Sequence, residues 1–238
     1  MWQPSEMRSV ASAKVTTRNL FGLAVLLVTN VMAEDPKQHV RYIAIGDSYT
    51  IGEGASANES WPAVLTRHLR AEGMQIDLVA NPSRTGWTTK DVIDKELPTF
   101  RDLQPDFGTL LIGVNDWVQG VDAETFRHRF AFIADQMLGV VKDKNRLLVV
   151  TIPDFGVTPE GPKYSRGRDI SAGIAAFNRI VLEESQKRGL RVVDIFERSK
   201  SMAQDRSLVA KDGLHPSAKE YAEWEKLIFP AATELLTR

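Results

Sequence analysis

Ser48, Asp212 and His215 are of the three residue types that together perform nucleophilic catalysis, and Asp212 precedes His215 by three residues. A serine hydroxyl is a weak nucleophile at neutral pH and needs a base within hydrogen-bond reach. Histidine is the usual base because its pKa lies near working pH. One turn of chain can bring Asp212 to the imidazole Nδ1, which fixes the tautomer and stabilises the imidazolium. Taken singly, Ser48 also suits a helix N-cap, and Asp212 suits an ordinary turn.

The composition narrows the choice of nucleophile and base. The chain has no cysteine, which excludes a thiol nucleophile, disulfides and thiolate metal sites. A covalent nucleophile must therefore be an oxygen or a lysine amine. Of the four histidines, only His215 falls in a predicted loop at the sheet edge. His39 precedes the first predicted strand, and His68 and His128 fall inside predicted helices.

Five apolar runs separated by amphipathic segments predict the scaffold that positions these residues. Each run is almost continuously apolar, which is typical of parallel strands covered on both faces. Crossovers between such strands are right-handed. We predict an α/β fold, a three-layer α/β/α sandwich whose five-stranded parallel sheet has the flavodoxin-like order 2-1-3-4-5. The predicted strands are residues 42–45, 76–80, 107–112, 147–152 and 192–196.

Local signals place the intervening helices. Ser60 can cap a helix over residues 61–70, and Thr88 with Asp91 resembles a capping box. Pro98 is expected to limit how far that second helix runs, because proline lacks a backbone donor and clashes with the preceding turn. Apolar residues at helical spacing predict further helices over 126–140 and 170–181 and after Pro216.

The predicted topology brings four polar loops to one edge of the sheet. In an open parallel sheet, sites form outside the carboxyl ends of the strands. The loops at this edge contain small and polar residues, so segments that are distant in sequence should converge there. These segments are residues 46–50, 81–87, 113–117 and 212–216.

The four segments resemble the sequence blocks of the SGNH hydrolase superfamily, also called the GDSL family of esterases and lipases. Tyr49 stands where the family's name would place leucine, and the resemblance covers residues 40–238. Four blocks in the right order, each after the right strand, are more specific than any one of them. The matching residues are Gly46-Asp47-Ser48, Gly86, Gly113-x-Asn115-Asp116 and Asp212-x-x-His215.

The resemblance implies a serine esterase with a Ser48-His215-Asp212 acyl-enzyme mechanism. It also implies an oxyanion hole formed by the backbone N–H groups of Ser48 and Gly86 and the side-chain amide of Asn115. Without a Cβ, the Gly86 backbone can approach a substrate closely. The family acts on carboxylic esters of small molecules, glycans and lipids, and the blocks imply no cofactor and no metal.

Four more residues flank the expected catalytic positions. Asp47 and Asp116 are interpreted as residues that hold the catalytic loops in place. Trp87 and Trp117 either line the acyl or alcohol pocket or pack against the sheet edge.

Residues 1–33 have the plan of a secretory signal peptide, with a basic stretch, an apolar run over 20–28 and an expected cut after Ala33. The run is shorter than the ~20 residues that a membrane span needs. We therefore expect a single hydrolase domain over 34–238, a secreted or periplasmic location and no stable membrane span after cleavage. The alternative is an uncleaved anchor or a disordered tail.

Other functions are weighed on the same residues. The formal net charge is -1, so the basic surplus typical of a nucleic-acid binder is missing. Asp47, Asp116, Asp212 and His215 could be interpreted as a metal cluster, but no second histidine lies near the site and no phosphate-loop motif occurs. Thr50 breaks the G-x-S-x-G motif of α/β-hydrolases. An acyltransferase with the same acyl-enzyme and a non-catalytic carbohydrate-binding module are the open alternatives.

Overall fold

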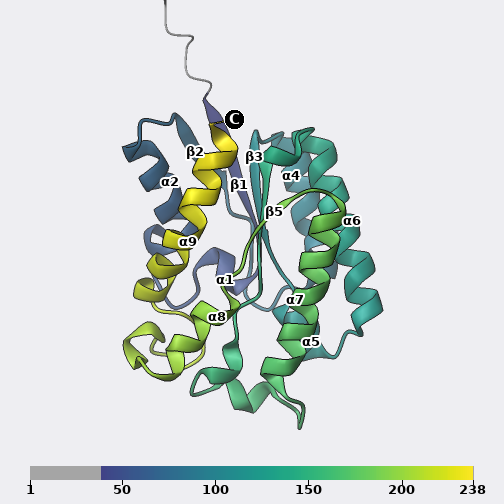
Figure 1. Cartoon of the computed structure of the whole chain (residues 1–238), viewed down its shortest axis with the longest axis vertical. Coiled ribbons are helices and arrows are strands. Elements are labelled where there is room, and N and C mark those ends of the chain that lie inside the picture. Colours follow the sequence, from purple (N-terminus) through teal and green to yellow (C-terminus); the bar gives the residue numbers. More distant parts are fainter. Residues whose placement is uncertain (1–38, 238) are drawn as a thin grey trace, which may run out of the picture. The chain divides into compact units, whose positions relative to one another are not determined.

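The computed structural model describes residues 39–237 and contains one parallel sheet of five strands in the order β2-β1-β3-β4-β5. The sheet is flanked by helices on both faces, which confirms the predicted three-layer fold (Figure 1). The predicted signal peptide and its cut after Ala33 lie outside the described residues. The strands are β1 (Val40–Gly46), β2 (Ile76–Ala80), β3 (Phe107–Leu111), β4 (Leu147–Val150) and β5 (Arg191–Val193).

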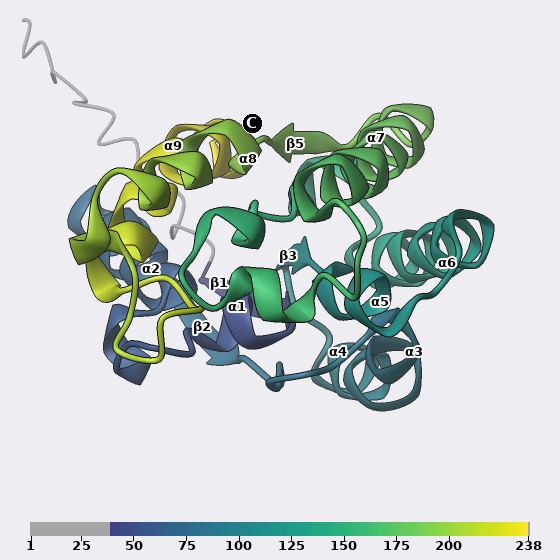
Figure 2. The ribbon, with the colours of Figure 1, turned by 90° about the horizontal axis from the view of Figure 1, so that it is seen from below.

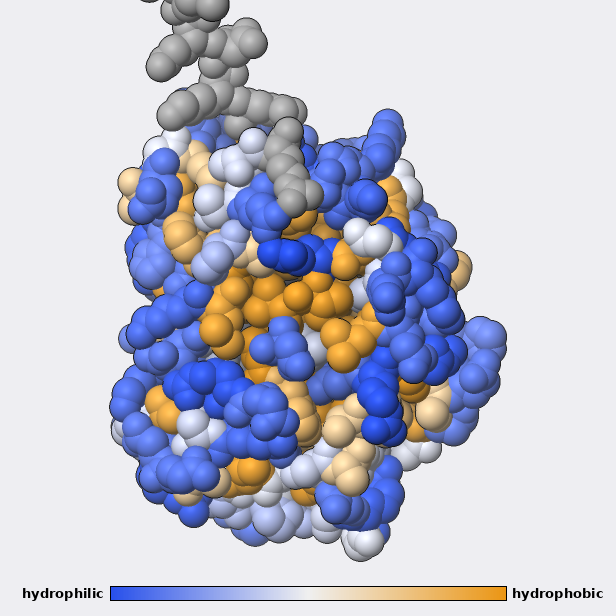
Figure 3. Space-filling view, in the orientation of Figure 1, coloured by the Kyte–Doolittle hydropathy of each residue, from blue (hydrophilic) through white to orange (hydrophobic). Residues whose placement is uncertain are grey.

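Two groups of helices bury the sheet. Helices α2 (Trp61–Ala71) and α9 (Ala218–Leu236) pack together on one face, and α4 (Leu97–Leu103), α6 (Ala123–Val141) and α7 (Ile170–Lys187) cover the other (Figures 1 and 2). An apolar band lies between α9 and α7 on the face shown in Figure 3. None of the helices between residues 39 and 237 has the length and apolarity to cross a membrane.

Shorter helices lie in the connections. The α-helical ones are α1 (Ser48–Ile51), α3 (Thr89–Asp91), α5 (Val114–Gln119) and α8 (Phe196–Ser199). A π-helical turn, η2, spans Val92–Glu96. The 3-10 turns are η1 (Ala57–Glu59), η3 (Lys144–Arg146), η4 (Phe155–Val157), η5 (Gly161–Tyr164), η6 (Lys200–Ala203) and η7 (Arg206–Leu208).

Strands β4 and β5 end earlier than their apolar runs predict. Beyond β4, the Asn178 side chain accepts a hydrogen bond from the Ile152 N–H and donates one to the Ile152 carbonyl, both at 2.8 Å. Beyond β5, the Ile195 N–H donates to the Thr151 hydroxyl at 2.9 Å. Side chains therefore replace strand pairing, and the chain leaves the sheet while its apolar residues stay buried.

Two expected helix signals are wrong. Ser60 precedes α2, but its hydroxyl donates back to the Ala57 carbonyl at 2.9 Å and caps no helical N–H. Pro98 does not stop the helix that begins after Thr88, because the wide turn of η2 precedes α4 and Pro98 occupies an early position of that helix. The capping box of Thr88 and Asp91 is confirmed.

Candidate active site

Ser48 lies directly after β1, at the carboxyl edge of the sheet that Figure 2 views from below. Asp47, rather than Ser48, caps α1: its Oδ1 accepts a hydrogen bond from the Tyr49 N–H at 3.0 Å. Gly46 is required before them, because a Cβ there would lie 2.3 Å from the Leu111 carbonyl oxygen. The alternative role of Ser48 as a helix cap is therefore not what the structure shows.

His215 and Asp212 form a hydrogen-bonded pair. His215 Nδ1 lies 2.7 Å from Asp212 Oδ2, and the other carboxylate oxygen accepts from the Leu214 N–H at 2.9 Å and the His215 N–H at 3.0 Å. Partial burial raises the pKa of Asp212, but these hydrogen bonds outweigh it and the net shift is downward. Asp212 is thus held as a carboxylate that fixes the imidazole orientation.

Ser48, Asn115 and His215 line one small pocket of about 60 Å³. The three come from segments that are far apart in the sequence, as the carboxyl-edge argument predicts. Aromatic and aliphatic side chains supply the rest of the wall; they are Tyr49, Val114, Val118, Phe155, Tyr164 and Leu214.

Gly86, the third expected oxyanion-hole residue, does not line this pocket. Asn115 Nδ2 donates to the carbonyl of Trp87 at 2.8 Å, which ties α5 to the segment that contains Gly86. Gly86 has φ +85°, and a Cβ there would meet no atom within 4 Å. The backbone conformation, more than crowding, is therefore what calls for glycine at this position.

Asp116 holds two of the loops together. Its carboxylate accepts hydrogen bonds from the Thr89 N–H at 2.8 Å and from the Thr89 hydroxyl, and it lies 3.9 Å from Arg129. Burial raises its pKa, although these partners partly offset the effect. The contact joins α5 to the start of α3, next to the Asn115–Trp87 bond.

Glu96 is a buried site residue that the sequence analysis missed. Its Oε2 accepts a hydrogen bond from the Gly46 N–H at 3.1 Å, directly behind the segment that carries Ser48. Burial raises the pKa of Glu96 to about 9 and that of neighbouring Asp47 to about 8. The sequence does mark Glu96 as a buried carboxylate, because it shares a helical face with the apolar residues Val92 and Phe100, both fully buried.

Neither candidate pocket tryptophan lines the pocket. Trp117 is buried against Phe155, with 6.0 Å between ring centroids, and the Arg168 guanidinium lies 3.9 Å from its ring. Trp117 therefore supports a pocket wall from behind. Trp87 has Lys95 5.0 Å from its ring and contributes its carbonyl to Asn115.

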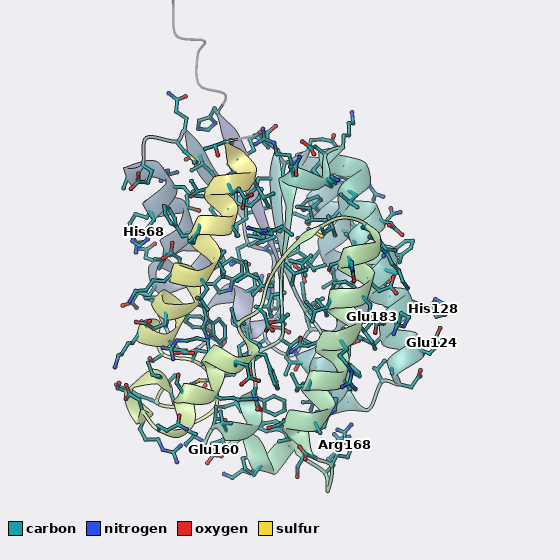
Figure 4. All side chains as sticks on the ribbon, in the orientation of Figure 1. His68, Glu124, His128, Glu160, Arg168 and Glu183 are labelled. Atoms are coloured by element: carbon teal, nitrogen blue, oxygen red, sulfur yellow. The ribbon has the colours of Figure 1, made fainter. Side chains whose placement is uncertain are left out.

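The other histidines lie away from the pocket, each beside a carboxylate. His68 and His128 fall on α2 and α6, on the outside of the layers (Figure 4). Within residues 39–237, no three His, Asp or Glu side chains gather as a metal site requires. The pairs are His39 with Asp77, His68 with Glu225 and His128 with Glu124.

The model of the GDSL-like lipase/acylhydrolase family matches residues 44–222, which include Ser48, Gly86, Asn115, Asp212 and His215. The chain belongs to this family. It is accordingly a carboxylic ester hydrolase of the SGNH type. No curated protein sequence matches the chain.

Solved structures share the family's fold. TesA is 21% identical with a TM-score of 0.66, covering 82% of this chain and 99% of its own. A lipase/acylhydrolase from Enterococcus faecalis is 20% identical with a TM-score of 0.67, covering 84% and 96%. A family 3 carbohydrate esterase from Clostridium thermocellum is 20% identical with a TM-score of 0.66, covering 83% and 97%. At these identities the likeness shows the fold alone.

Proposed function

We propose that this esterase hydrolyses small carboxylic esters through an acyl-enzyme on Ser48. The observation that carries the proposal is the position of His215, whose Nδ1 is 2.7 Å from Asp212 Oδ2 while its ring lines the same pocket as Ser48. With Nδ1 engaged by the carboxylate, Nε2 is the nitrogen that takes the Ser48 proton.

The reaction proceeds in two halves. Ser48 Oγ attacks the ester carbonyl, His215 takes its proton and passes it to the leaving alcohol, and the acyl group stays on Ser48. Water then gives a proton to His215 and attacks the acyl carbon, and His215 passes that proton to Ser48 Oγ as the acid leaves. In both halves the carbonyl oxygen becomes negative, and we assign the N–H groups of Ser48 and Gly86 and the amide of Asn115 to it.

The size of the pocket favours short acyl groups. Its volume of about 60 Å³ leaves room for a chain of a few carbons, and Phe155 and Tyr164 form part of its wall. We further propose that residues 1–33 export the protein, on the strength of their basic and apolar pattern.

Hydrolysis of p-nitrophenyl acetate, butyrate and octanoate by the purified protein tests this function, with Ser48→Ala beside it. We expect turnover of the two short esters, much slower turnover of octanoate, and background rates in the variant. Equal rates for the variant and the wild type, or a folded wild type without activity, would overturn the proposal.

A further inference from the structure

Tyr49 follows Ser48 directly and forms part of the pocket wall. Its side chain is only 3% exposed. The ring lies edge-on to two others, with centroids 5.9 Å from the ring of His215 and 5.9 Å from that of Trp224. This packing holds the Tyr49 ring between His215, the expected base, and Trp224 of α9.

The Tyr49 hydroxyl has no hydrogen-bond partner within residues 39–237. Two other buried tyrosines of this chain are paired. The Tyr42 hydroxyl lies 2.8 Å from the Thr109 hydroxyl, and the Tyr221 hydroxyl donates to the Glu53 carbonyl at 2.8 Å. The Tyr49 oxygen is not one of the fully enclosed unpaired atoms, so it can be reached from outside the core. The unpaired hydroxyl of a pocket residue is therefore available to a bound molecule.

The groups around the Tyr49 hydroxyl determine which kind of substrate atom can bind to it. Burial disfavours a negative charge at this point, and the nearby acid groups, Asp154 and Asp212 among them, add to the effect. Together they raise the pKa of Tyr49 well above its usual value of 10. The hydroxyl thus stays protonated as a donor, and an anionic substrate group would be repelled. The acceptor that fits is an uncharged oxygen.

We propose that the Tyr49 hydroxyl donates a hydrogen bond to an uncharged oxygen of the substrate other than the reacting carbonyl oxygen. The inference rests on the proposed function and specifies its substrate class: esters whose acyl or alcohol part carries a hydroxyl, ether or second carbonyl oxygen. A plain alkyl ester of the same size leaves the hydroxyl unpaired and is the poorer substrate.

Two pairs of near-isosteric esters test this with Tyr49→Phe, which removes only the hydroxyl. The acyl pair is p-nitrophenyl methoxyacetate against p-nitrophenyl butyrate, and the alcohol pair is 2-methoxyethyl acetate against butyl acetate. For each ester, kcat/KM of the variant is divided by that of the wild type, which cancels intrinsic reactivity. In at least one pair we expect the ether ester to lose about 3- to 10-fold more than its hydrocarbon partner, the size of one neutral hydrogen bond.

Tyr221→Phe is the matched control, because its hydroxyl bonds to the backbone and its ring touches the same Trp224. It should change both members of each pair equally. The same equal change in Tyr49→Phe, or no change, would overturn the inference and assign Tyr49 to packing alone. Ser48→Ala distinguishes this result from failure of the proposed function. If turnover depends on Ser48 but Tyr49→Phe affects both members of each pair equally, only the role of Tyr49 is overturned.

Discussion

The side-chain amide of Asn115 donates a 2.8 Å hydrogen bond to the carbonyl oxygen of Trp87. The carboxylate of the next residue, Asp116, accepts a 2.8 Å hydrogen bond from the Thr89 N–H. Adjacent residues of α5 therefore fix the segment that carries Gly86. One hydrogen of the Asn115 amide is used in this way, and in the proposed mechanism the other donates to the oxyanion. A donor that is held in place before the substrate arrives is what stabilisation of an oxyanion requires.

Asn115→Ala is expected to lower kcat by about 10²- to 10³-fold with a small change in KM, because the lost donor acts on charge that develops in the transition state. Steady-state kinetics on a short p-nitrophenyl ester measure the split. Gln119→Ala, an exposed change at the end of the same helix, is the control and should leave both constants unchanged. A loss confined to KM would assign Asn115 to ground-state binding instead.

Asp212→Asn is expected to lower kcat/KM by about 10²- to 10⁴-fold, because an amide no longer fixes the imidazole tautomer or stabilises the imidazolium. The comparison variant is Asp205→Asn, whose side chain bonds to Lys219 and Ser207 and lies outside the pocket. The measurement is kcat/KM of both variants on the same ester, and Asp205→Asn should retain the wild-type value. Near wild-type activity in Asp212→Asn would remove this carboxylate from the mechanism.

Buried acids should make the protein less stable as the pH rises. Folding raises the pKa of Glu96 from 4.5 to about 9 and that of Asp47 from 3.8 to about 8, because burial disfavours their charged forms. The folded state therefore keeps protons that the unfolded chain releases, and the free energy of unfolding falls from about pH 4 up to these values. Glu96→Gln is neutral at every pH and keeps an acceptor for the Gly46 N–H.

Thermal unfolding from pH 5 to pH 9 measures this effect. The wild type should lose Tm across the range, and Glu96→Gln should lose less. Glu72→Gln, at an exposed position after α2, should follow the wild-type slope. Parallel slopes for all three proteins would show that Glu96 does not carry the dependence.

Two helical glycines give opposite predictions for stability. A Cβ on Gly173 of α7 would lie 1.8 Å from Trp117 Nε1, so Gly173→Ala must displace the ring that backs Phe155. We expect a loss of about 1–3 kcal/mol, as for other overpacked sites. Gly139 of α6 has open space around it, and Gly139→Ala should gain about 0.5–1 kcal/mol from helix propensity. Urea unfolding of both variants checks the pair; equal effects would contradict it.

The sheet and the meeting of distant loops were predictable because buried parallel strands leave a clear apolar pattern and their carboxyl ends share one edge. The remaining residues of the candidate site were harder to predict from the sequence. Phe155 and Tyr164 come from 3-10 turns after β4, where no periodicity marks a pocket wall. Glu96 is the last residue of a π turn that shifts the helical register before Pro98. The roles proposed for Gly86 and Asn115 rest on family resemblance, since spacing alone does not identify an oxyanion hole.

The most direct test of the central claim is to trap the nucleophile. The protein is incubated with a p-nitrophenyl alkylphosphonate, which phosphonylates an activated serine and releases p-nitrophenol, and the adduct is located by peptide mass spectrometry. We predict one adduct per chain, on Ser48, absent in Ser48→Ala and formed far more slowly in His215→Ala. An active protein that stays unlabelled, or that carries the adduct on another residue, would contradict the Ser48 mechanism.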